Sequence, residues 1–157
     1  MEYKINASEA FKRYSDMVYR LAFARVKNKY DADDILQEVF LRFIKVKEKV
    51  NNEDHAKALL IRITINCSKS LLSSSWFKRT EPLSETLSVS DKEIDTLDAV
   101  LRLPQKYRTV IHLHYYMGYS IDEIATILKS KPSTVKSQLH RARQKLKIDL
   151  EGVEVNV

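Results

Sequence analysis

Only two glycines and three prolines interrupt the 157 residues of this chain. Glycine and proline end helices and build the turns between strands, so a chain with few of them favours long helices over a many-turned sheet. Hydrophobic residues make up 44% of the sequence, enough for one ordinary domain or two small ones to bury a core. We therefore predict an all-α protein.

The spacing of apolar residues predicts seven helices and no strand. They are expected at about 8–27, 31–49, 54–78, 93–102, 104–117 and 120–128, and from Pro132 onward. Residues 79–92 are rich in Ser and Thr and have no sustained apolar period, so we interpret them as a flexible linker. The predicted organisation is two small helical domains at 1–78 and 93–148, with the linker at 79–92 and an acidic tail at 149–157.

The sign of the charge alternates along the chain. Lys and Arg outnumber Asp and Glu by 16 to 10 in residues 1–80 and by 9 to 2 in residues 104–148. Acids outnumber bases by 6 to 2 in residues 81–103 and by 3 to 0 in residues 149–157. This pattern fits two modules that each meet a polyanion, although ordinary solvated faces would give the same pattern.

The C-terminal domain carries the start and stop signals of a helix-turn-helix. Pro104 suits the first turn of a helix, and Gly118 suits the left-handed position that ends it. The sequence "SIDE" that follows is a capping box, in which Ser120 and Glu123 bond to each other's backbone amides. Pro132 then begins the last helix. A short capped helix, a tight turn and a longer basic helix are typical of a helix-turn-helix.

The last helix has a predicted buried side and a predicted exposed side. At 100° per residue, the apolar stripe consists of Val135, Leu139, Ala142 and Leu146. The opposite side and its flanks carry Ser133, Ser137, His140, Arg141, Gln144, Lys136, Arg143 and Lys145. In a major-groove helix, the N-terminal half reaches base edges and flanking cations contact phosphates. Arg141 is the best candidate for a bidentate bond to guanine, whereas the alternative is a charged solvent face.

Two helices of the N-terminal domain also carry distinctive stripes. The 31–49 helix should bury Ile35, Val39, Phe43, Val46 and Val50 and expose Asp34, Gln37, Glu38 and Leu41. An exposed leucine among acids suggests a partner surface, although single exposed apolar residues are common. The 54–78 helix carries a polar stripe that consists of Arg62, Asn66, Lys69 and Ser73. An ordinary solvent-exposed face would also explain this stripe.

Three motifs resemble bacterial sigma factors. The segment "LPQKYRTVIHLHYYMGYSIDEIATILKSKPSTVKSQLHRARQKL" at 103–146 resembles their C-terminal promoter-reading domain. The segment "DADDILQEVFLRF" at 31–43 resembles their polymerase-binding helix, and "ALLIRITINCSKSLL" at 58–72 resembles the helix that opens promoter DNA. With two domains and a short linker, the chain resembles the extracytoplasmic-function group, and the resemblance covers about 8–148.

The resemblance implies an alternative sigma factor that binds core RNA polymerase and directs promoter-specific transcription initiation. It implies docking on the clamp helices of the polymerase by Asp34, Gln37, Glu38 and Leu41, and melting of the minus-ten element by Arg62, Asn66, Lys69 and Ser73. It also implies reading of the minus-thirty-five element by Ser133, Thr134, Lys136, Ser137, His140, Arg141, Arg143 and Gln144. The C-terminal domain would also contact the polymerase flap, and an anti-sigma factor is a possible further partner. The chain departs from the family pattern at Leu59, where Trp is frequent, and at Ser70, where Asp is usual.

Other classes of protein fit less well. A helix-turn-helix regulator that acts without core polymerase would share the C-terminal fold, but it would not need the exposed acids of the 31–43 segment. An enzyme is disfavoured because Gly118 and Gly152 stand alone, without a phosphate-binding loop, and no metal-ligand spacing occurs. We expect no cofactor. We expect a cytoplasmic protein without membrane insertion, with Cys67 as an inert core thiol.

Overall fold

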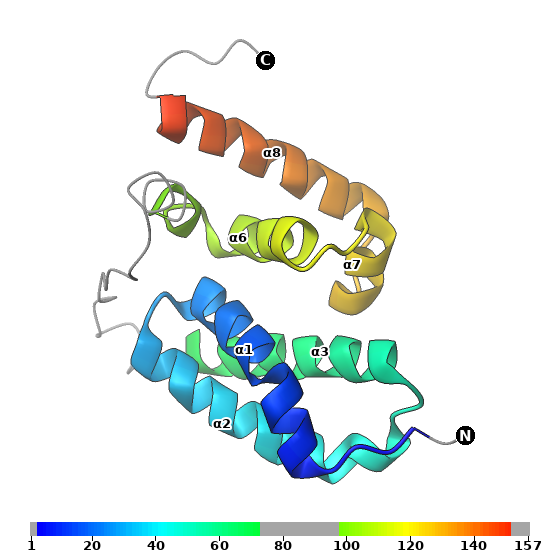
Figure 1. Cartoon of the computed structure of the whole chain (residues 1–157). Coiled ribbons are helices and arrows are strands. Elements are labelled where there is room, and N and C mark those ends of the chain that lie inside the picture. Colours follow the sequence, from blue (N-terminus) through cyan, green and yellow to red (C-terminus); the bar gives the residue numbers. More distant parts are fainter. Residues whose placement is uncertain (1–2, 73–97, 152–157) are drawn as a thin grey trace. The chain divides into compact units, whose positions relative to one another are not determined.

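The computed structural model describes residues 3–72 and 98–151, and every regular element within them is helical (Figure 1). The chain divides into two compact units, Met1–Leu83 and Ser84–Val157. The all-α fold predicted from the scarcity of glycine and proline is confirmed. Several predictions lie outside the described residues: the linker at 79–92, Ser73, the last part of the 54–78 helix and the first part of the 93–102 helix.

Within residues 3–72, three helices pack together in the N-terminal unit. These are α1 (Ala7–Val26), α2 (Lys29–Val46), which continues as a short 3-10 turn (Lys47–Lys49), and α3 (Glu53–Leu72). Each helix packs on both of the others. The core between them includes Tyr14, Val18, Ile35, Val39, Phe43, Val50, Leu60 and Cys67. The predicted inward stripe of α2 is therefore buried, except that Val46 is half-buried.

A short joint fixes the angle between α1 and α2. Lys27 ends α1 in the left-handed conformation, with φ 59°, and its amide donates to the carbonyl of Phe23 at 2.8 Å. The next residue, Asn28, is buried and caps α2, because its side-chain oxygen accepts from the amides of Tyr30 at 2.8 Å and Asp31 at 3.2 Å. Such a cap stabilises a helix by about 0.5–2 kcal/mol.

A buried hydrogen bond connects this joint to α3. Arg25, in the last turn of α1, donates from Nε to the hydroxyl of Ser68 at 2.8 Å, and both side chains are buried. The Ser68 hydroxyl donates in turn to the carbonyl of Ile65 at 2.7 Å. Because a buried guanidinium needs partners, this bond holds the C-terminal part of α3 beside the α1–α2 joint.

In the C-terminal unit the described residues start at 98, and residues 98–101 are helical. It continues with α6 (Gln105–Ile111), a π-helical turn (His112–Tyr116), α7 (Ile121–Leu128) and α8 (Pro132–Glu151). The single helix predicted at 104–117 is thus divided by the π-helical turn. Pro104 caps α6 instead of lying inside its first turn. Since α8 extends to Glu151, the first residues of the predicted acidic tail are helical.

Local signals define the helix-turn-helix as predicted. Gly118 has φ 78°, which only glycine adopts without strain. The capping box is present, because the Glu123 amide donates to the Ser120 hydroxyl at 3.1 Å and the Ser120 amide donates to the Glu123 carboxylate at 3.0 Å. These bonds to Ser120 lower the pKa of Glu123. Lys129, at φ 54°, ends α7 before Pro132 begins α8.

Two further sequence predictions concern membranes and Cys67, and the structure also places two histidines. Within the described ranges no helix combines the length and the apolar character needed to cross a bilayer. Cys67 is buried in the core, and this burial raises the pKa of its thiol. His112 is buried and His114 bonds through Nδ1 to the Tyr119 carbonyl at 2.8 Å, so both have structural roles.

Candidate nucleic-acid interface

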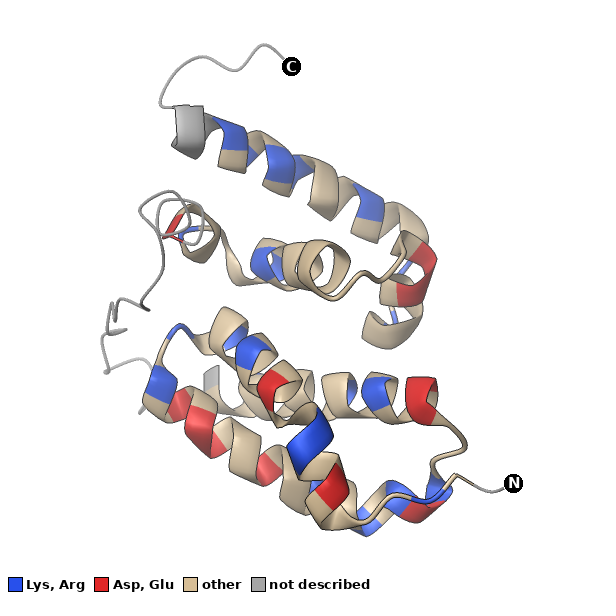
Figure 2. Ribbon diagram, in the orientation of Figure 1, with Lys and Arg blue, Asp and Glu red and all other residues tan. Residues whose placement is uncertain are grey.

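The orientation of α8 is set by its apolar stripe. Val135, Leu139 and Ala142 are fully buried against the rest of the C-terminal unit, and Leu146 is half-buried. Their packing on α6 and α7 turns the polar side of α8 outward. Basic residues follow one another along this helix, whereas Asp and Glu are concentrated in the first half of α2 (Figure 2).

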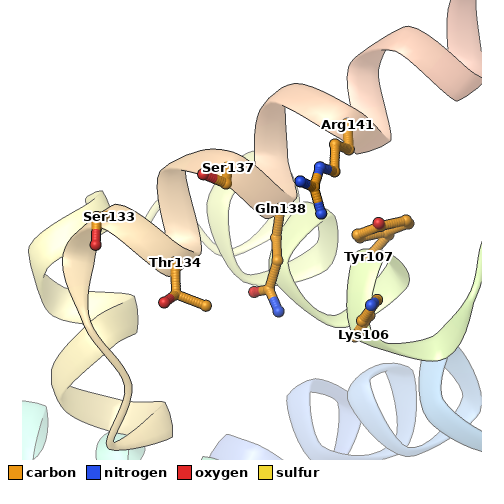
Figure 3. Close-up of a pocket in the computed structure, with 7 residues that line it drawn as sticks. All are labelled: Lys106, Tyr107, Ser133, Thr134, Ser137, Gln138 and Arg141. Carbon is orange, nitrogen blue, oxygen red and sulfur yellow. The ribbon is translucent and has the colours of Figure 1, made fainter.

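A pocket of about 350 Å³ lies between the N-terminal half of α8 and the start of α6 (Figure 3). From α8, Gln138 and Arg141 extend toward α6, which supplies the opposite side of the pocket. The lining residues are Ser133, Thr134, Ser137, Gln138, Arg141, Lys106 and Tyr107. The structure therefore brings four predicted DNA-binding residues, Ser133, Thr134, Ser137 and Arg141, into one place.

The chemistry of the lining suits a nucleic acid. Lys106 and Arg141 are cations, and the described lining residues include no carboxylate. The hydroxyl and amide groups of Ser133, Ser137 and Gln138 can donate and accept hydrogen bonds. Such a surface can hold a phosphate and reach the edge of a base at the same time.

The other predicted DNA-binding residues lie outside this pocket. Lys136 and His140 are exposed on α8, and Gln144 is half-buried. Arg143 donates from Nε to the Tyr115 hydroxyl, and its guanidinium carbon lies 5.5 Å from the centroid of that ring. Tyr115 comes from the π-helical turn, so a second element of the unit holds Arg143. These four side chains extend the polar surface of α8 beyond the pocket.

Sequence reasoning missed three lining residues: Lys106, Tyr107 and Gln138. Gln138 follows four residues after Thr134 and precedes Arg141 by three, so the spacing places all three on one side of α8. That spacing was available from the sequence, but it did not show which side of α8 faces α6. Lys106 and Tyr107 belong to a helix that packs across α8, and no local pattern predicts that contact.

The predicted polymerase-docking residues form an exposed stripe on α2. Asp34, Gln37 and Glu38 are exposed, and Leu41 has 59% of its surface accessible. Arg42 donates from Nε to Glu38 at 2.9 Å, and this bond raises the pKa of the arginine. Two apolar side chains that sequence reasoning did not select lie on the same side of the helix: Tyr30, 58% exposed, and Ile44, 42% exposed.

The predicted minus-ten stripe lies on α3. Asn66 and Lys69 are exposed, and Arg62 is half-buried. The residues between them, Cys67 and Ser68, are buried. One side of α3 therefore packs in the core while its polar side faces solvent, as the sequence predicted.

Comparisons with known proteins agree on one family. Residues 10–77 match the family described as Sigma-70 region 2, and residues 94–146 match Sigma-70, region 4. The chain is 33% identical over 138 residues to RNA polymerase sigma factor SigV of Bacillus subtilis, covering 84% of this chain and 83% of SigV. It is 30% identical over 161 residues to ECF RNA polymerase sigma factor SigW of the same organism, covering 89% of this chain and 86% of SigW.

Solved structures show the same fold. The sigma factor RpoE, in its complex with the anti-sigma factor NepR from Bartonella quintana, superposes with a TM-score of 0.78 at 18% identity, covering 94% of this chain and 98% of RpoE. CnrH, in complex with the cytosolic domain of CnrY, superposes with a TM-score of 0.68 at 21% identity, covering 94% of this chain and 89% of CnrH.

Proposed function

Because this chain belongs to the ECF group of RNA polymerase sigma factors, we propose that its two units divide the work of promoter recognition between them. The protein is an alternative sigma factor that directs promoter-specific transcription, and its partners are core RNA polymerase and promoter DNA. In our proposal the C-terminal helix-turn-helix reads the minus-thirty-five element, and the N-terminal unit docks on the polymerase and melts the minus-ten element.

The observation that carries the proposal for the C-terminal unit is the pocket on α8. Ser137 and Arg141 lie in its lining together with Ser133 and Thr134, and the helix is fixed behind them by its buried stripe. A helix held in this way can enter a major groove with its N-terminal half toward the base edges. We assign Ser137 and Arg141 to bases and Lys136, outside the pocket, to a phosphate.

Two open surfaces support the proposal for the N-terminal unit. The α2 stripe combines exposed Asp34, Gln37 and Glu38 with the exposed Leu41, which is the mixed composition of a protein interface. We assign this stripe to the clamp helices of the polymerase. Asn66 and Lys69 on α3 would hold an extruded base of the minus-ten element, since extrusion costs a few kcal/mol that new contacts must offset.

The exposed stripe on α2 and the match of residues 10–77 to Sigma-70 region 2 favour this function over a regulator that acts without core polymerase. In this role the sigma factor supplies binding surfaces and the polymerase supplies catalysis. We further infer that the protein acts in the cytoplasm, where core polymerase is found. We also infer that an anti-sigma factor holds it inactive, since the similar structure of RpoE is a complex with the anti-sigma factor NepR.

Run-off transcription tests the proposal. Core polymerase from the same organism is incubated with genomic DNA fragments, with and without the purified full chain. We expect defined transcripts from a subset of fragments only when the protein is present, since core polymerase alone has no promoter preference. Start sites then reveal the two promoter elements. Identical transcripts with and without the protein, on every fragment, would contradict the proposal.

A further inference from the structure

Gln138 extends from α8 toward α6, and Lys106 of α6 lines the same pocket. Gln138 is half-buried, whereas Ser137 and Arg141 beside it are exposed. Thr134, Gln138 and Arg141 follow each other at steps of four and three residues, so their side chains form a single row along the pocket. A nucleic acid that contacts Arg141 from the pocket side therefore meets Gln138 in the same row.

Lys106 reaches the same pocket from a different helix. Its neighbour Tyr107 is buried, with 6% of its surface accessible, and belongs to the core of the C-terminal unit. The Lys106 ammonium lies 5.2 Å from the centroid of the Tyr107 ring, a distance at which a cation is attracted to an aromatic face. The buried ring thus gives the exposed lysine a preferred position at the wall of the pocket.

We propose that Gln138 is a specificity-determining residue for the upstream promoter element and that Lys106 binds a DNA phosphate beside it. The inference rests on the proposed function and extends it, because DNA would then be contacted by side chains of both α8 and α6. A glutamine amide carries a donor and an acceptor in one plane and matches the N6 and N7 groups of adenine. A lysine is a point charge suited to a phosphate. Gln138 therefore selects an adenine–thymine pair adjacent to the pair read by Arg141.

The alternative role for Gln138 is packing between α8 and α6. A packing residue would change the stability of the C-terminal unit but leave the preference for each base pair as it was. A base contact gives the opposite result, since its loss changes the preference at one base pair and leaves the others unchanged. Base preference therefore separates the two roles.

The first test measures promoter use by the holoenzyme. Templates carry the identified promoter with each upstream base pair replaced in turn, and core polymerase is combined with the wild-type chain, Gln138→Ala or Gln138→Arg. We expect Gln138→Ala to lose about 5- to 150-fold of the preference at one base pair, corresponding to one bidentate contact. Gln138→Arg should shift the preference at that same pair from adenine to guanine.

Unchanged preference profiles for both variants would overturn the inference for Gln138. Circular dichroism of each variant checks that the helices remain folded, and Gln138→Arg gives a positive readout that loss of folding cannot mimic. A wild-type holoenzyme without any promoter preference would instead overturn the proposed function, and the inference with it.

The second test measures the salt dependence of holoenzyme binding to the promoter. Lys106→Met keeps most of the aliphatic chain but removes the charge, and Lys147→Met does the same at an exposed position near the other end of α8. We expect Lys106→Met to weaken binding by a similar factor for all promoter variants and to reduce the salt slope by about 0.9. Lys147→Met should leave the slope unchanged. Equal slopes for wild type and Lys106→Met would overturn the phosphate contact.

Discussion

The two units present their predicted binding residues in different ways. In the C-terminal unit, Ser137 and Arg141 of α8 share a pocket with Lys106 of α6, so two helices define one site. In the N-terminal unit, the stripe around Leu41 lies on α2 and the stripe around Asn66 lies on α3, each along a single helix. A ligand contacted by side chains of two helices is restricted in its orientation, whereas a stripe on one helix mainly adds contact area. We therefore expect substitutions in the pocket to change specificity and substitutions on the stripes to change affinity.

The units also differ in how they bury an arginine. Arg25 donates to Ser68, a side chain on another helix and 43 residues away in sequence. Arg108 donates to the carbonyl of Leu103, five residues away, at 2.6 Å, and burial lowers its pKa to about 10. The first bond joins two helices, while the second closes a local turn. The Arg25–Ser68 bond therefore depends on tertiary structure, whereas the Arg108–Leu103 bond depends on local structure.

Core substitutions should give the largest effects and show whether the units unfold separately. Leu60 in α3 and Leu139 in α8 are both fully buried. We expect Leu60→Ala to destabilise the N-terminal unit, and Leu139→Ala the C-terminal unit, by about 2–5 kcal/mol each through loss of packing and the cavity left behind. Amide hydrogen exchange, read for each unit, is the measurement. Equal loss of protection in both units for either variant would show that they unfold as one.

Removal of a buried hydroxyl should sharpen the contrast between the two interiors. Ser68→Ala leaves the Nε of buried Arg25 without this acceptor, so we expect a loss of about 1–3 kcal/mol. The matched variant Thr109→Ala removes a hydroxyl that donates to the Gln105 carbonyl in its own helix at 2.9 Å, and its effect should be smaller. Urea unfolding gives both values. A larger loss for Thr109→Ala would reverse the comparison.

Two variants of α8 should separate base contacts from phosphate contacts. Arg141→Ala should reduce discrimination at one upstream base pair by about 1–3 kcal/mol, because it removes a bidentate contact. Lys136→Ala should weaken binding about uniformly across sequences and lower the salt slope. Holoenzyme binding to a set of promoter variants at several salt concentrations provides both readouts. If both variants act identically on all sequences, the assignment of roles is wrong.

On α2, an exposed apolar residue should affect affinity without affecting folding. Leu41 is 59% exposed, so Leu41→Ala should leave the unfolding free energy within about 0.5 kcal/mol of wild type. We expect it to weaken binding to core polymerase by about 1 kcal/mol, because it removes an apolar contact at the interface. A fluorescence competition assay measures the affinity. The control is Lys57→Ala on α3, which should leave the affinity unchanged. If Leu41→Ala also leaves the affinity unchanged, Leu41 is not part of the interface.

Two acids at equivalent helix positions should give the smallest effects, with opposite dependence on pH. Asp31 is buried near the start of α2, and its Oδ2 has no hydrogen-bond partner among the described residues. Burial, and to a smaller extent the negative charge of Asp34, raises the pKa of Asp31 above 3.8. Its contribution to stability is present below that value and is lost as pH rises through the folded pKa. Glu123 in the capping box has a lowered pKa, so its contribution is lost as pH falls below 4.5 through the folded pKa.

The variants Asp31→Asn and Glu123→Gln test this contrast. Thermal unfolding is followed for each unit between acid and neutral pH. The wild-type protein should lose stability through Asp31 as the pH rises, and Asp31→Asn should not show this loss. It should lose stability through Glu123 as the pH falls, and Glu123→Gln should not show that loss. Parallel pH profiles for the two variants relative to wild type would contradict the assigned directions.

Local features of the fold could be predicted from the sequence because their causes lie within a few residues. The capping box at Ser120 and Glu123, the left-handed Gly118 and the start of α8 at Pro132 are all determined by neighbours along the chain. The buried stripe through Val135 could be predicted because helical periodicity fixes it.

Features that depend on packing between helices could not be predicted. The bond from Arg25 to Ser68 and the contact of Arg143 with Tyr115 each join distant segments. The role of Lys106 in the pocket depends on how α6 crosses α8, for which no local signal exists. The polar side of α8 could therefore be predicted to be exposed, whereas the residues of α6 that line the same pocket could not.

The π-helical turn at His112–Tyr116 makes the C-terminal unit sensitive to deletion. In this turn the Met117 amide bonds to the His112 carbonyl five residues back, at 3.1 Å, so the turn contains one residue more than an α-helical turn. Loss of a single residue there would restore an α-helix and rotate the preceding segment by about 100° relative to α7. Lys106 and Tyr107 would then face away from α8. Because Tyr107 is a buried core residue, a deletion of one residue in this turn should destabilise the C-terminal unit together with its pocket.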